Sequence, residues 1–379
     1  MYNRNNSFPY IWAILVGMLL ISFLGIYATS EAAVTRQIST SAKSAVLYVP
    51  ETKDFLYLKN PDERLPMAST TKIMTALVAI ENCQLNDPVA IDCGAVGIEG
   101  SSAYLKEGEV LTVEQLLYAL MLQSANDAAV ALAIHISGSV EGFASVMTER
   151  ARQIGANNTC FTNSHGLDDE QHYTTARDLA LITAEAMFNE SFLQIVSTTK
   201  KSIDTQLTRR TFINHNKLLW RYDGCIGVKT GYTKRSGRCL VGAAERNGLT
   251  LISVTLDAPN DWVDHDTMLD YGFDTLEKIT LVNSGELKYT IPVIGGINAT
   301  LNVTNMDSAT VILPCADNKV SSHLSLSRFA VAPVRKGDIF GEIIYTVNGK
   351  ECARVKLVAT EDIQTKNNNN FFKRFFSFK

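Results

Sequence analysis

The residues best suited to covalent chemistry are Ser69 and Lys72, which stand three positions apart in the tetrapeptide Ser-Thr-Thr-Lys. An apolar run with helical periodicity follows over residues 72–80, so the two side chains should share one face at the start of a helix. A serine hydroxyl attacks a carbonyl only when a base removes its proton. A buried lysine near a second positive charge can be neutral enough to be that base. The helix N-terminus also offers N–H groups to a developing oxyanion.

The same tetrapeptide occurs a second time, at Ser197–Lys200. This copy is followed by the polar segment KSIDTQ and has no apolar helix behind it. We interpret it as a solvated stretch, so the tetrapeptide by itself is weak support for catalysis.

Two further motifs strengthen the first copy. Ser124-Ala125-Asn126 lies between two predicted helices, and Lys229-Thr230-Gly231 lies on a predicted strand. Ser-x-x-Lys, Ser-x-Asn and Lys-Thr-Gly in this order mark penicillin-interacting serine enzymes. Each motif is weak alone, but the three in order, each in a fitting structural context, form a strong signal.

With these motifs the chain resembles the low-molecular-mass penicillin-binding proteins that are serine-type D-Ala-D-Ala carboxypeptidases. The resemblance runs from about Ala45 to Ile363. The stretches LTVEQLLYALMLQSANDAAVALA, NSHGLDDEQHYTTARDLA and GVKTGYTKRSGRCLVGAA look like the family's catalytic domain, and APVRKGDIFGEI and VKLVATEDI look like its C-terminal β-domain. The resemblance implies an α+β fold: a β-lactamase/transpeptidase-like catalytic domain, with an antiparallel sheet and helices, followed by a small all-β domain.

The resemblance also implies catalytic roles. Ser69 would attack the carbonyl between the two terminal D-alanines of a peptidoglycan stem peptide, and Lys72 would accept its proton. Ser124 would relay a proton to the leaving D-alanine. Water would then hydrolyse the acyl-enzyme. β-Lactams resemble the dipeptide and would acylate Ser69 in the same way.

Substrate binding falls, by the same resemblance, to the other motif residues. Asn126 would hold the peptide amide, and Lys229 would supply positive potential. Thr230 would bind the terminal carboxylate of the substrate. Gly231 follows it on the same predicted strand. The backbone N–H groups of Ser69 and Tyr232 would form the oxyanion hole.

One departure concerns the substrate carboxylate. The family commonly carries an arginine on the strand after the Lys-Thr-Gly hairpin, and our alignment puts Thr250 at that position. Arg238, near Lys229 across the predicted hairpin, is a candidate substitute, and a solvated charge at the strand end is the alternative interpretation. His165 in Ser-His-Gly-Leu is interpreted as a structural loop residue, because a lysine base needs no His–Asp relay.

Two other functions stay open. A β-lactamase would share the three motifs, but we find no convincing Glu-x-x-Leu-Asn deacylation signature between Ser124 and Lys229, and the β-domain and tail would be superfluous. A non-catalytic module that binds the cell wall or senses penicillin is the other alternative. The intact motif residues argue against it.

Periodicity predicts the elements that position these residues. Short strands over 44–49 and 55–58 form a hairpin, and helices cover 72–80, 112–121, 126–136, 139–154 and 175–188. After Gly224 three strands, GCIGVKTGY, RCLVGAAE and LTLISVTL, are joined by turns and should be antiparallel neighbours. DWVDHDTMLDYGFDTLEKI predicts a helix over 261–279. Short alternating strands then form a separate all-β unit.

Both ends of the chain differ from the rest. Residues 1–32 combine Arg4, an apolar run over 11–27 and small residues, which is typical of a secretory signal peptide, with an uncleaved anchor as the alternative. Near the other end, Asn367–Asn370 form a linker before FFKRFFSFK. On a helical wheel its phenylalanines share one arc and its internal basic residues the other, which favours a segment lying in a membrane interface over a disordered tail.

These features predict the domain organisation and the location. We expect a signal peptide over 1–32, a penicillin-binding serine peptidase domain over 33–278, a C-terminal β-sandwich domain over 279–363, and a linker with an amphipathic membrane anchor over 364–379. The protein should be secreted across the cytoplasmic membrane and held on its outer face, toward the cell wall. Its partners should be stem peptides, β-lactams and the membrane surface.

Composition narrows the remaining choices. The chain has 379 residues, of which 46% are hydrophobic and 20% charged, so it contains at least two folded units and is not disordered. A formal net charge of −4 excludes a general nucleic-acid binder. The 7 cysteines include no Cys-x-x-Cys pair and no zinc-type cluster, so we predict no metal site and no cofactor. A hairpin turn near Lys234 would separate Cys225 from Cys239 by roughly 13 Å, too far for a disulfide.

Overall fold

The computed structural model describes residues 38–205 and 207–366. The predicted signal peptide and the basic aromatic tail after Lys366 lie outside the described residues. Their cleavage and membrane binding therefore stay predictions. Among the described residues no single helix is long and apolar enough to cross a membrane, although two bent helix pairs pass a test of length and composition.

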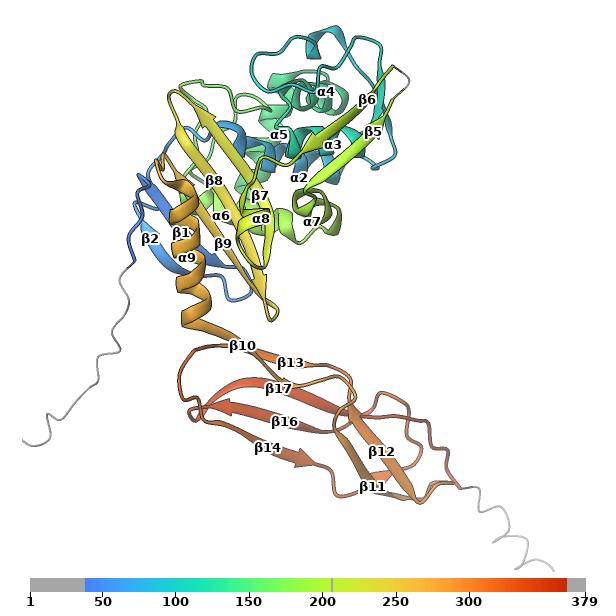
Figure 1. Ribbon diagram of the computed structural model, residues 1–379. Coiled ribbons are helices and arrows are strands. Elements are labelled where there is room, and N and C mark those ends of the chain that lie inside the picture. The colour runs from blue at the N-terminus through green and yellow to red at the C-terminus, as the bar shows by residue number, and fades with distance from the viewer. Residues whose placement is uncertain (1–37, 206, 367–379) are drawn as a thin grey trace, which may run out of the picture. The chain divides into compact units, whose positions relative to one another are not determined.

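A five-stranded antiparallel sheet in the order β2-β1-β9-β8-β7 forms the centre of the larger domain (Figure 1). The hairpin β1-β2 and the three consecutive strands β7, β8 and β9 are the strands that the sequence pattern predicts. Strand β1 joins the two sets because it pairs with both β2 and β9. The bounds are β1 Ser44–Val49, β2 Asp54–Lys59, β7 Cys225–Thr233, β8 Gly237–Arg246 and β9 Leu249–Leu256.

Helices cover both faces of this sheet. Alternate residues of β1 and β9 point to opposite faces of the sheet. Leu47 and Leu251 lie under helix α9 (Asp261–Thr275). Gly272 of this helix packs so closely on the sheet that a Cβ there would come within 2.4 Å of Leu251. Val46 and Ile252 belong instead to the large core shared with the helices on the other face. Strands buried on both faces explain the nearly continuous apolar runs in their sequences.

The helical part of the larger domain begins with the short 3-10 helix η1 (Ala68–Thr71), which leads into the buried helix α2. A capping box of Thr112 with Gln115 begins the helix over Val113–Leu122, and Ser139 caps the helix that ends at Ile154. The main helices are α2 Lys72–Asn82, α3 Val113–Leu122, α4 Asn126–Ser137, α5 Val140–Ile154, α6 Ala176–Met187 and α7 Glu190–Ser197. The smaller elements are η2 Cys93–Ala95, α8 Leu218–Arg221, and the hairpins of β3 Pro88–Ala90 with β4 Val110–Thr112 and of β5 Lys200–Asp204 with β6 Arg209–Ile213.

Two local predictions are wrong in detail. Helix α9 ends at Thr275 and not at 279, because the backbone becomes extended at Leu276 and continues as a strand rich in β-branched residues. The β7-β8 turn is centred one residue later than the predicted turn near Lys234, since Thr233 pairs with Gly237. In this register Cys225 pairs with Ala244 and Cys239 with Gly231, and both are free thiols.

The all-β domain consists of two sheets. Six strands form one sheet in the order β14-β16-β17-β12-β11-β15, and β10 pairs with β13 in the other. Buried apolar side chains from both sheets, including Val282, Ala309, Ile343 and Leu357, pack in one cluster. The strands are β10 Leu276–Val282, β11 Lys288–Ile294, β12 Thr300–Asn305, β13 Ala309–Pro314, β14 Val320–Leu326, β15 Ala330–Val331, β16 Ile339–Val347 and β17 Lys350–Ala359.

Candidate active site

Ser69 lies in the 3-10 turn that leads into α2, and this turn is held by a close backbone contact. Ala68 has a positive φ of 48°, and its carbonyl group packs directly on Gly166. A Cβ at Gly166 would lie 2.0 Å from Ala68 O, and φ there is +91°. Both the space and the conformation therefore require glycine at this position.

Lys72, the first residue of α2, is fully buried and directs its ammonium group at three acceptors. Its Nζ lies 3.0 Å from Ser69 Oγ, 2.7 Å from Asn126 Oδ1 and 2.6 Å from the backbone oxygen of His165. The last two oxygens can only accept, so each holds an N–H of the lysine. The hydroxyl can also donate. A neutral Lys72 therefore turns its lone pair toward Ser69, in the geometry that proton abstraction needs.

The electrostatics favour that neutral form. Burial lowers the pKa of Lys72 well below its ordinary value, and the charge of Lys229 lowers it further, against the opposing effect of Asp127. Burial also lowers the pKa of Lys229 to about 7. Two buried ammonium groups repel each other, so the site holds one charge more readily than two.

The Ser-Ala-Asn motif forms the junction between α3 and α4. Ser124 has a positive φ of 61°, and Asn126 begins α4. The amide of Asn126 is fixed at both ends, because its Oδ1 accepts from Lys72 and its Nδ2 donates to Glu99 O over 2.5 Å. Its backbone N–H donates to Ser101 O over 2.7 Å. This junction therefore ties α2, α4 and the segment that carries Ser101 together.

The Lys-Thr-Gly motif lies on β7, opposite Ser69. Lys229 is buried and its Nζ donates to Thr230 O over 2.9 Å. A Cβ at Gly231 would lie 3.0 Å from Ser69 N, so glycine lets the strand approach the turn that carries the nucleophile. The side chain of Tyr232 is 66% exposed, beside the mouth of the site.

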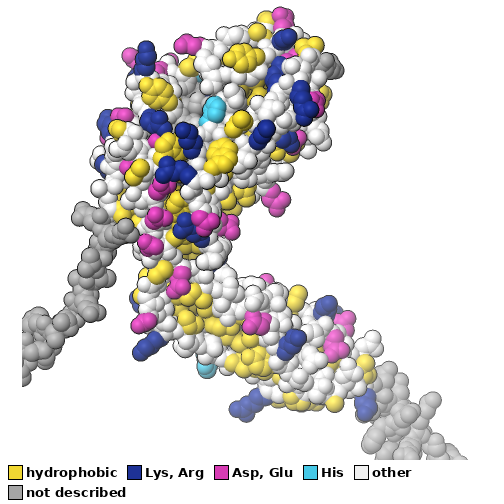
Figure 2. Space-filling view, in the orientation of Figure 1, with side chains coloured by type: hydrophobic (Ala, Val, Ile, Leu, Met, Phe, Trp, Pro, Cys, Tyr) yellow, Lys and Arg dark blue, Asp and Glu magenta, His cyan; other side chains and the backbone are white. Residues whose placement is uncertain are grey.

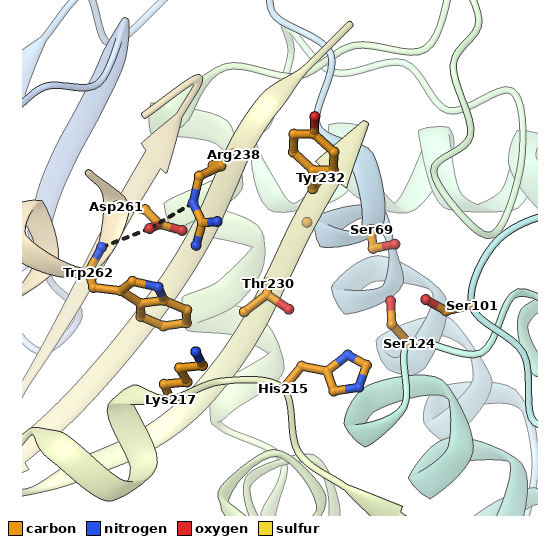
Figure 3. Close-up of a pocket in the computed structure, with 11 residues that line it drawn as sticks. Ser69, Ser101, Ser124, His215, Lys217, Thr230, Tyr232, Arg238, Asp261 and Trp262 are labelled. Carbon is orange, nitrogen blue, oxygen red and sulfur yellow. Dashed lines mark hydrogen bonds and ion pairs between the residues drawn. The ribbon is translucent and has the colours of Figure 1, made fainter. Parts of the chain in front are cut away.

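One pocket collects these groups (Figure 3). Its volume is about 420 Å³, and Ser69, Ser124 and Ser101 lie together on one side of it, with Thr230 on the other. The structure thus brings together the residues predicted from the sequence: Lys72 and Asn126 lie behind Ser69, and Lys229 lies behind Thr230. The pocket is lined by Ser69, Ser101, Ser124, His215, Lys217, Thr230, Gly231, Tyr232, Arg238, Asp261 and Trp262.

Arg238 lies in this pocket and Thr250 does not. Arg238 pairs with Tyr232 across the β7-β8 hairpin, and its Nε forms an ion pair of 3.0 Å with the buried carboxylate of Asp261. In Figure 3 its terminal nitrogens point into the pocket, between Tyr232 and Trp262. Thr250 pairs instead with Glu245, near the far end of β8. The register therefore places Thr250 outside the pocket, so the position that our alignment matched to the family arginine does not face a carboxylate bound at Thr230.

Positive side chains gather on this face of the larger domain. Figure 2 shows dark-blue Lys and Arg side chains over β7 and β8, and Lys217 adds a second flexible cation to the pocket wall opposite Arg238. No sequence motif indicated Lys217, His215, Asp261 or Trp262. They come from the approach to β7 and from the start of α9, and no motif links those segments to Ser69.

The comparisons with known proteins agree with this geometry. A family model described as D-alanyl-D-alanine carboxypeptidase matches residues 29–260, and a model of the penicillin-binding protein 5 C-terminal domain matches residues 276–365. The chain belongs to the D-alanyl-D-alanine carboxypeptidase family. The predictions of family, fold class and enzyme class are therefore confirmed.

Relatives resemble this carboxypeptidase along nearly its whole length. D-alanyl-D-alanine carboxypeptidase DacF of Bacillus subtilis is 31% identical, with 95% of this chain and 96% of the relative covered. DacC of Escherichia coli is 30% identical, with 94% and 93% covered. The crystal structure of penicillin binding protein 5 from Haemophilus influenzae superposes with a TM-score of 0.64 at 30% identity and covers 86% of this chain and 99% of its own.

The second Ser-Thr-Thr-Lys copy of this carboxypeptidase has a different structure. Ser197 is the last residue of α7 and its hydroxyl donates to Leu193 O over 2.8 Å. Lys200 begins the exposed strand β5. Ser197 and Lys200 therefore share no helix face, as the interpretation of a solvated segment predicted. Among residues 38–205 and 207–366 no group of three His, Cys, Asp or Glu side chains is placed to hold a metal ion.

His172 is a further residue that the sequence analysis missed. The N–H of Thr162 donates to His172 Nδ1 over 3.0 Å, which leaves the ring proton on Nε2, 2.7 Å from Thr71 Oγ1. Thr71 in turn donates its hydroxyl to Ala68 O over 2.8 Å. The chain of bonds ends at the residue before the nucleophile. His172 is therefore a positioning residue for the turn that carries Ser69.

Acid should break this chain of bonds. Burial lowers the pKa of His172 from 6.5 to about 4, so the folded protein holds the neutral ring. Its contribution to stability is complete above pH 6.5 and is lost as the pH falls toward 4. The contribution amounts to at most about 3 kcal/mol. We expect urea unfolding between pH 7 and pH 4 to show this loss, and a shallower pH dependence for His172→Gln.

The exposed His135 offers a matched control. His135→Gln should keep the pH dependence of the unmodified protein. His172→Gln is expected to be less stable at pH 7, because Thr162 and Thr71 lose their shared partner, so the slope and not the absolute stability is the readout. Equal slopes in all three proteins would show that His172 does not titrate as described.

Proposed function

We propose that this carboxypeptidase removes the terminal D-alanine from peptidoglycan stem pentapeptides through an acyl-enzyme on Ser69. The observation that carries the proposal is the environment of Lys72. Two carbonyl-type oxygens hold its N–H groups, and the third neighbour of Nζ is the hydroxyl of Ser69. A lysine held in this way can accept a proton from one direction only, and that direction is the nucleophile.

Acylation then follows from the arrangement. Lys72 takes the Ser69 proton as Oγ bonds to the carbonyl carbon of the penultimate D-alanine. The carbonyl oxygen becomes an oxyanion, which the backbone N–H groups of Ser69 and Tyr232 stabilise. The C–N bond breaks when Ser124 passes the proton from Lys72 to the leaving nitrogen, and free D-alanine departs. The products are the Ser69 ester and a neutral lysine.

Deacylation reverses the proton path. Water attacks the ester carbonyl, Lys72 accepts its proton, and the proton returns to Ser69 Oγ as the ester C–O bond breaks. The shortened peptide leaves as a carboxylic acid. Lys72 thus acts as base and then acid in both halves of the reaction. A β-lactam enters by the same first step, because opening of its amide bond acylates Ser69.

The remaining pocket residues bind the substrate in this proposal. The family resemblance assigns the peptide amide to Asn126, whose side-chain amide bonds to Lys72 and to Glu99 O just behind Ser69. Lys229 supplies positive potential from beneath Thr230, and the terminal carboxylate lies between Thr230 and Arg238. Arg238 gives its Nε to Asp261, which leaves the donors of its terminal nitrogens for that carboxylate.

The location is part of the proposal. We propose a signal peptide over 1–32, a serine peptidase domain over 33–278, a β-sandwich domain over 279–363, and a membrane-anchoring tail over 364–379. Phe371–Lys379 should hold the enzyme on the outer face of the cytoplasmic membrane, toward the wall. Deleting these residues should release the mature protein from the membrane in a high-salt wash. Retention of the shortened protein in the membrane after that wash would assign the anchor to the N-terminal segment.

The covalent step has a direct test. The mature protein is incubated with penicillin, digested, and searched by mass spectrometry for the peptide that carries the adduct. The proposal expects one adduct, on Ser69, and release of D-alanine from a stem pentapeptide by the same preparation. An adduct on another residue would refute the assignment. Release of the penicillin product within a second would instead indicate a β-lactamase.

Arg238 gives a prediction about substrate recognition. Arg238→Gln should lower kcat/KM for a peptide ending in free D-Ala-D-Ala about 10- to 100-fold, mainly through KM, because a hydrogen-bonded charge pair of roughly 1.5–3 kcal/mol is lost. A peptide with an amidated C-terminus should show little change. Steady-state release of the terminal residue measures both.

Thr250→Ala is the control for that series. Thr250 lies on β9 outside the pocket and should tolerate the change without loss of activity. An Arg238→Gln enzyme that loses the same factor on the free acid and on the amide would contradict carboxylate recognition by Arg238.

A further inference from the structure

One end of the all-β domain exposes apolar side chains beside the point where the described chain ends. Ile294, Ile297, Phe329 and Val331, here called the apolar tip, are 53%, 59%, 50% and 60% exposed. Ile294 and Val331 are direct partners in the short parallel pairing of β11 with β15. The four side chains come from two segments that are distant in sequence and adjacent in the fold.

The strand pattern at the tip is unusual for a surface. Residues alternate inward and outward, so Ala330 and Val293 face the core while Val331 and Ile294 face out. An outward face on an antiparallel or edge strand ordinarily carries polar side chains. Here Phe329, Val331 and Ile294 are all apolar. Apolar residues gathered in this way on a surface mark an interaction site.

The charged side chains in the segments that build the tip are all basic. Residues 293–299, 327–333 and 363–366 contain Arg328 and Lys366 and no acidic residue. Asp362, which precedes the last segment, accepts the backbone N–H of Lys336 over 2.7 Å. Apolar side chains beside basic ones complement a membrane, whose interior is apolar and whose anionic headgroups are negatively charged.

The end of the described chain lies on the same loop. Ile297 N donates to Gln364 O over 2.9 Å, and Lys366 N donates to Gly295 O over 2.8 Å. Figure 1 shows the last described residues beside the end of β11. Phe371 follows five residues after Lys366, a reach of at most roughly 18 Å. A membrane that receives FFKRFFSFK therefore begins at most roughly 18 Å from Lys366, beside the tip.

We propose that the apolar tip is a second membrane-binding surface, which inserts Ile294, Ile297, Phe329 and Val331 among anionic lipids while Arg328 and Lys366 contact their phosphates. A second copy of the chain is a poorer fit. Strand β15 has two residues and Pro333 follows it closely, so this edge offers few hydrogen-bonding groups for strand addition. The inference rests on the proposed membrane location and not on the chemistry of Ser69.

The test measures binding of the mature full chain to vesicles of phosphatidylglycerol and phosphatidylethanolamine by co-sedimentation. The tip variant carries Ile294→Ser, Ile297→Ser, Phe329→Ser and Val331→Ser. The control carries Val320→Ser and Leu324→Ser, exposed residues on β14 at the opposite edge of the same sheet. The tip variant should bind about tenfold more weakly and the control normally. Binding should also weaken with added salt and on vesicles of phosphatidylcholine.

A protein ending at Lys366 separates the tip from the tail. It should retain salt-sensitive binding to the anionic vesicles, and the four tip substitutions should abolish that binding. Release of D-alanine in solution should be equal in all variants, which distinguishes a failed membrane surface from a failed enzyme. Equal vesicle binding by the tip variant and the control would overturn the proposal. A dimer that only the tip variant dissociates would also overturn it, in favour of a second copy.

Discussion

Replacing Ser69 with alanine is expected to abolish both D-alanine release and covalent capture of penicillin. The hydroxyl of Ser69 is the pocket group that Lys72 contacts, so its removal takes away the atom that forms the acyl bond. Loss of a catalytic nucleophile costs on the order of 10⁵- to 10⁶-fold in kcat. Single-turnover assays with a stem pentapeptide, and intact-mass measurement after penicillin treatment, would show the loss.

The chain supplies its own control for this substitution. Ser197 begins the second Ser-Thr-Thr-Lys copy, but it closes α7 and bonds to Leu193 O. Ser197→Ala should leave acylation and D-alanine release unchanged. Ser69→Ala should also fold normally, because the Ser69 side chain makes one hydrogen bond in the structure, to Lys72. A Ser69→Ala protein that still forms a penicillin adduct would refute Ser69 as the nucleophile.

The comparison of the two copies shows what a sequence pattern can predict. The letters are identical, and the apolar residues after Lys72 distinguish the helix that carries a buried lysine from a polar segment that cannot bury one. Local periodicity also predicts most of the helices and the strands β7, β8 and β9. These features depend on residues close in sequence, where hydrophobic spacing and capping residues determine the outcome.

The side chains that support the site residues are brought to them by the tertiary structure, so they could not be predicted from the sequence. Asp261 reaches Arg238 because α9 packs across β8. His172 reaches the nucleophile turn through Thr71, a hundred residues earlier in the chain. Neither spacing nor composition indicates these contacts. The apolar tip is likewise formed by segments that only the sheet brings together.

Lys72→Arg tests the proposed base, and we expect acylation to slow about 10³- to 10⁴-fold. Arginine keeps the positive charge but stays protonated at every accessible pH, so it cannot take the proton of Ser69. The matched control is Lys200→Arg in the second copy, on an exposed strand, which should have no effect. The rate of penicillin acylation, followed by stopped-flow, measures both variants under identical conditions.

The pH profile separates a lost base from a disturbed pocket. In the unmodified enzyme the neutral form of Lys72 is the active one, so acylation should slow as the pH falls through its lowered pKa. On the alkaline side Lys229, with a pKa of about 7, loses the charge that attracts the carboxylate, so the profile should fall again. Lys72→Arg should remove the acidic limb and keep the alkaline one. A Lys72→Arg enzyme that slows uniformly while retaining both limbs would mean that another group accepts the proton. In that case the three hydrogen bonds of Lys72 would position Ser69 and Asn126 without transferring a proton.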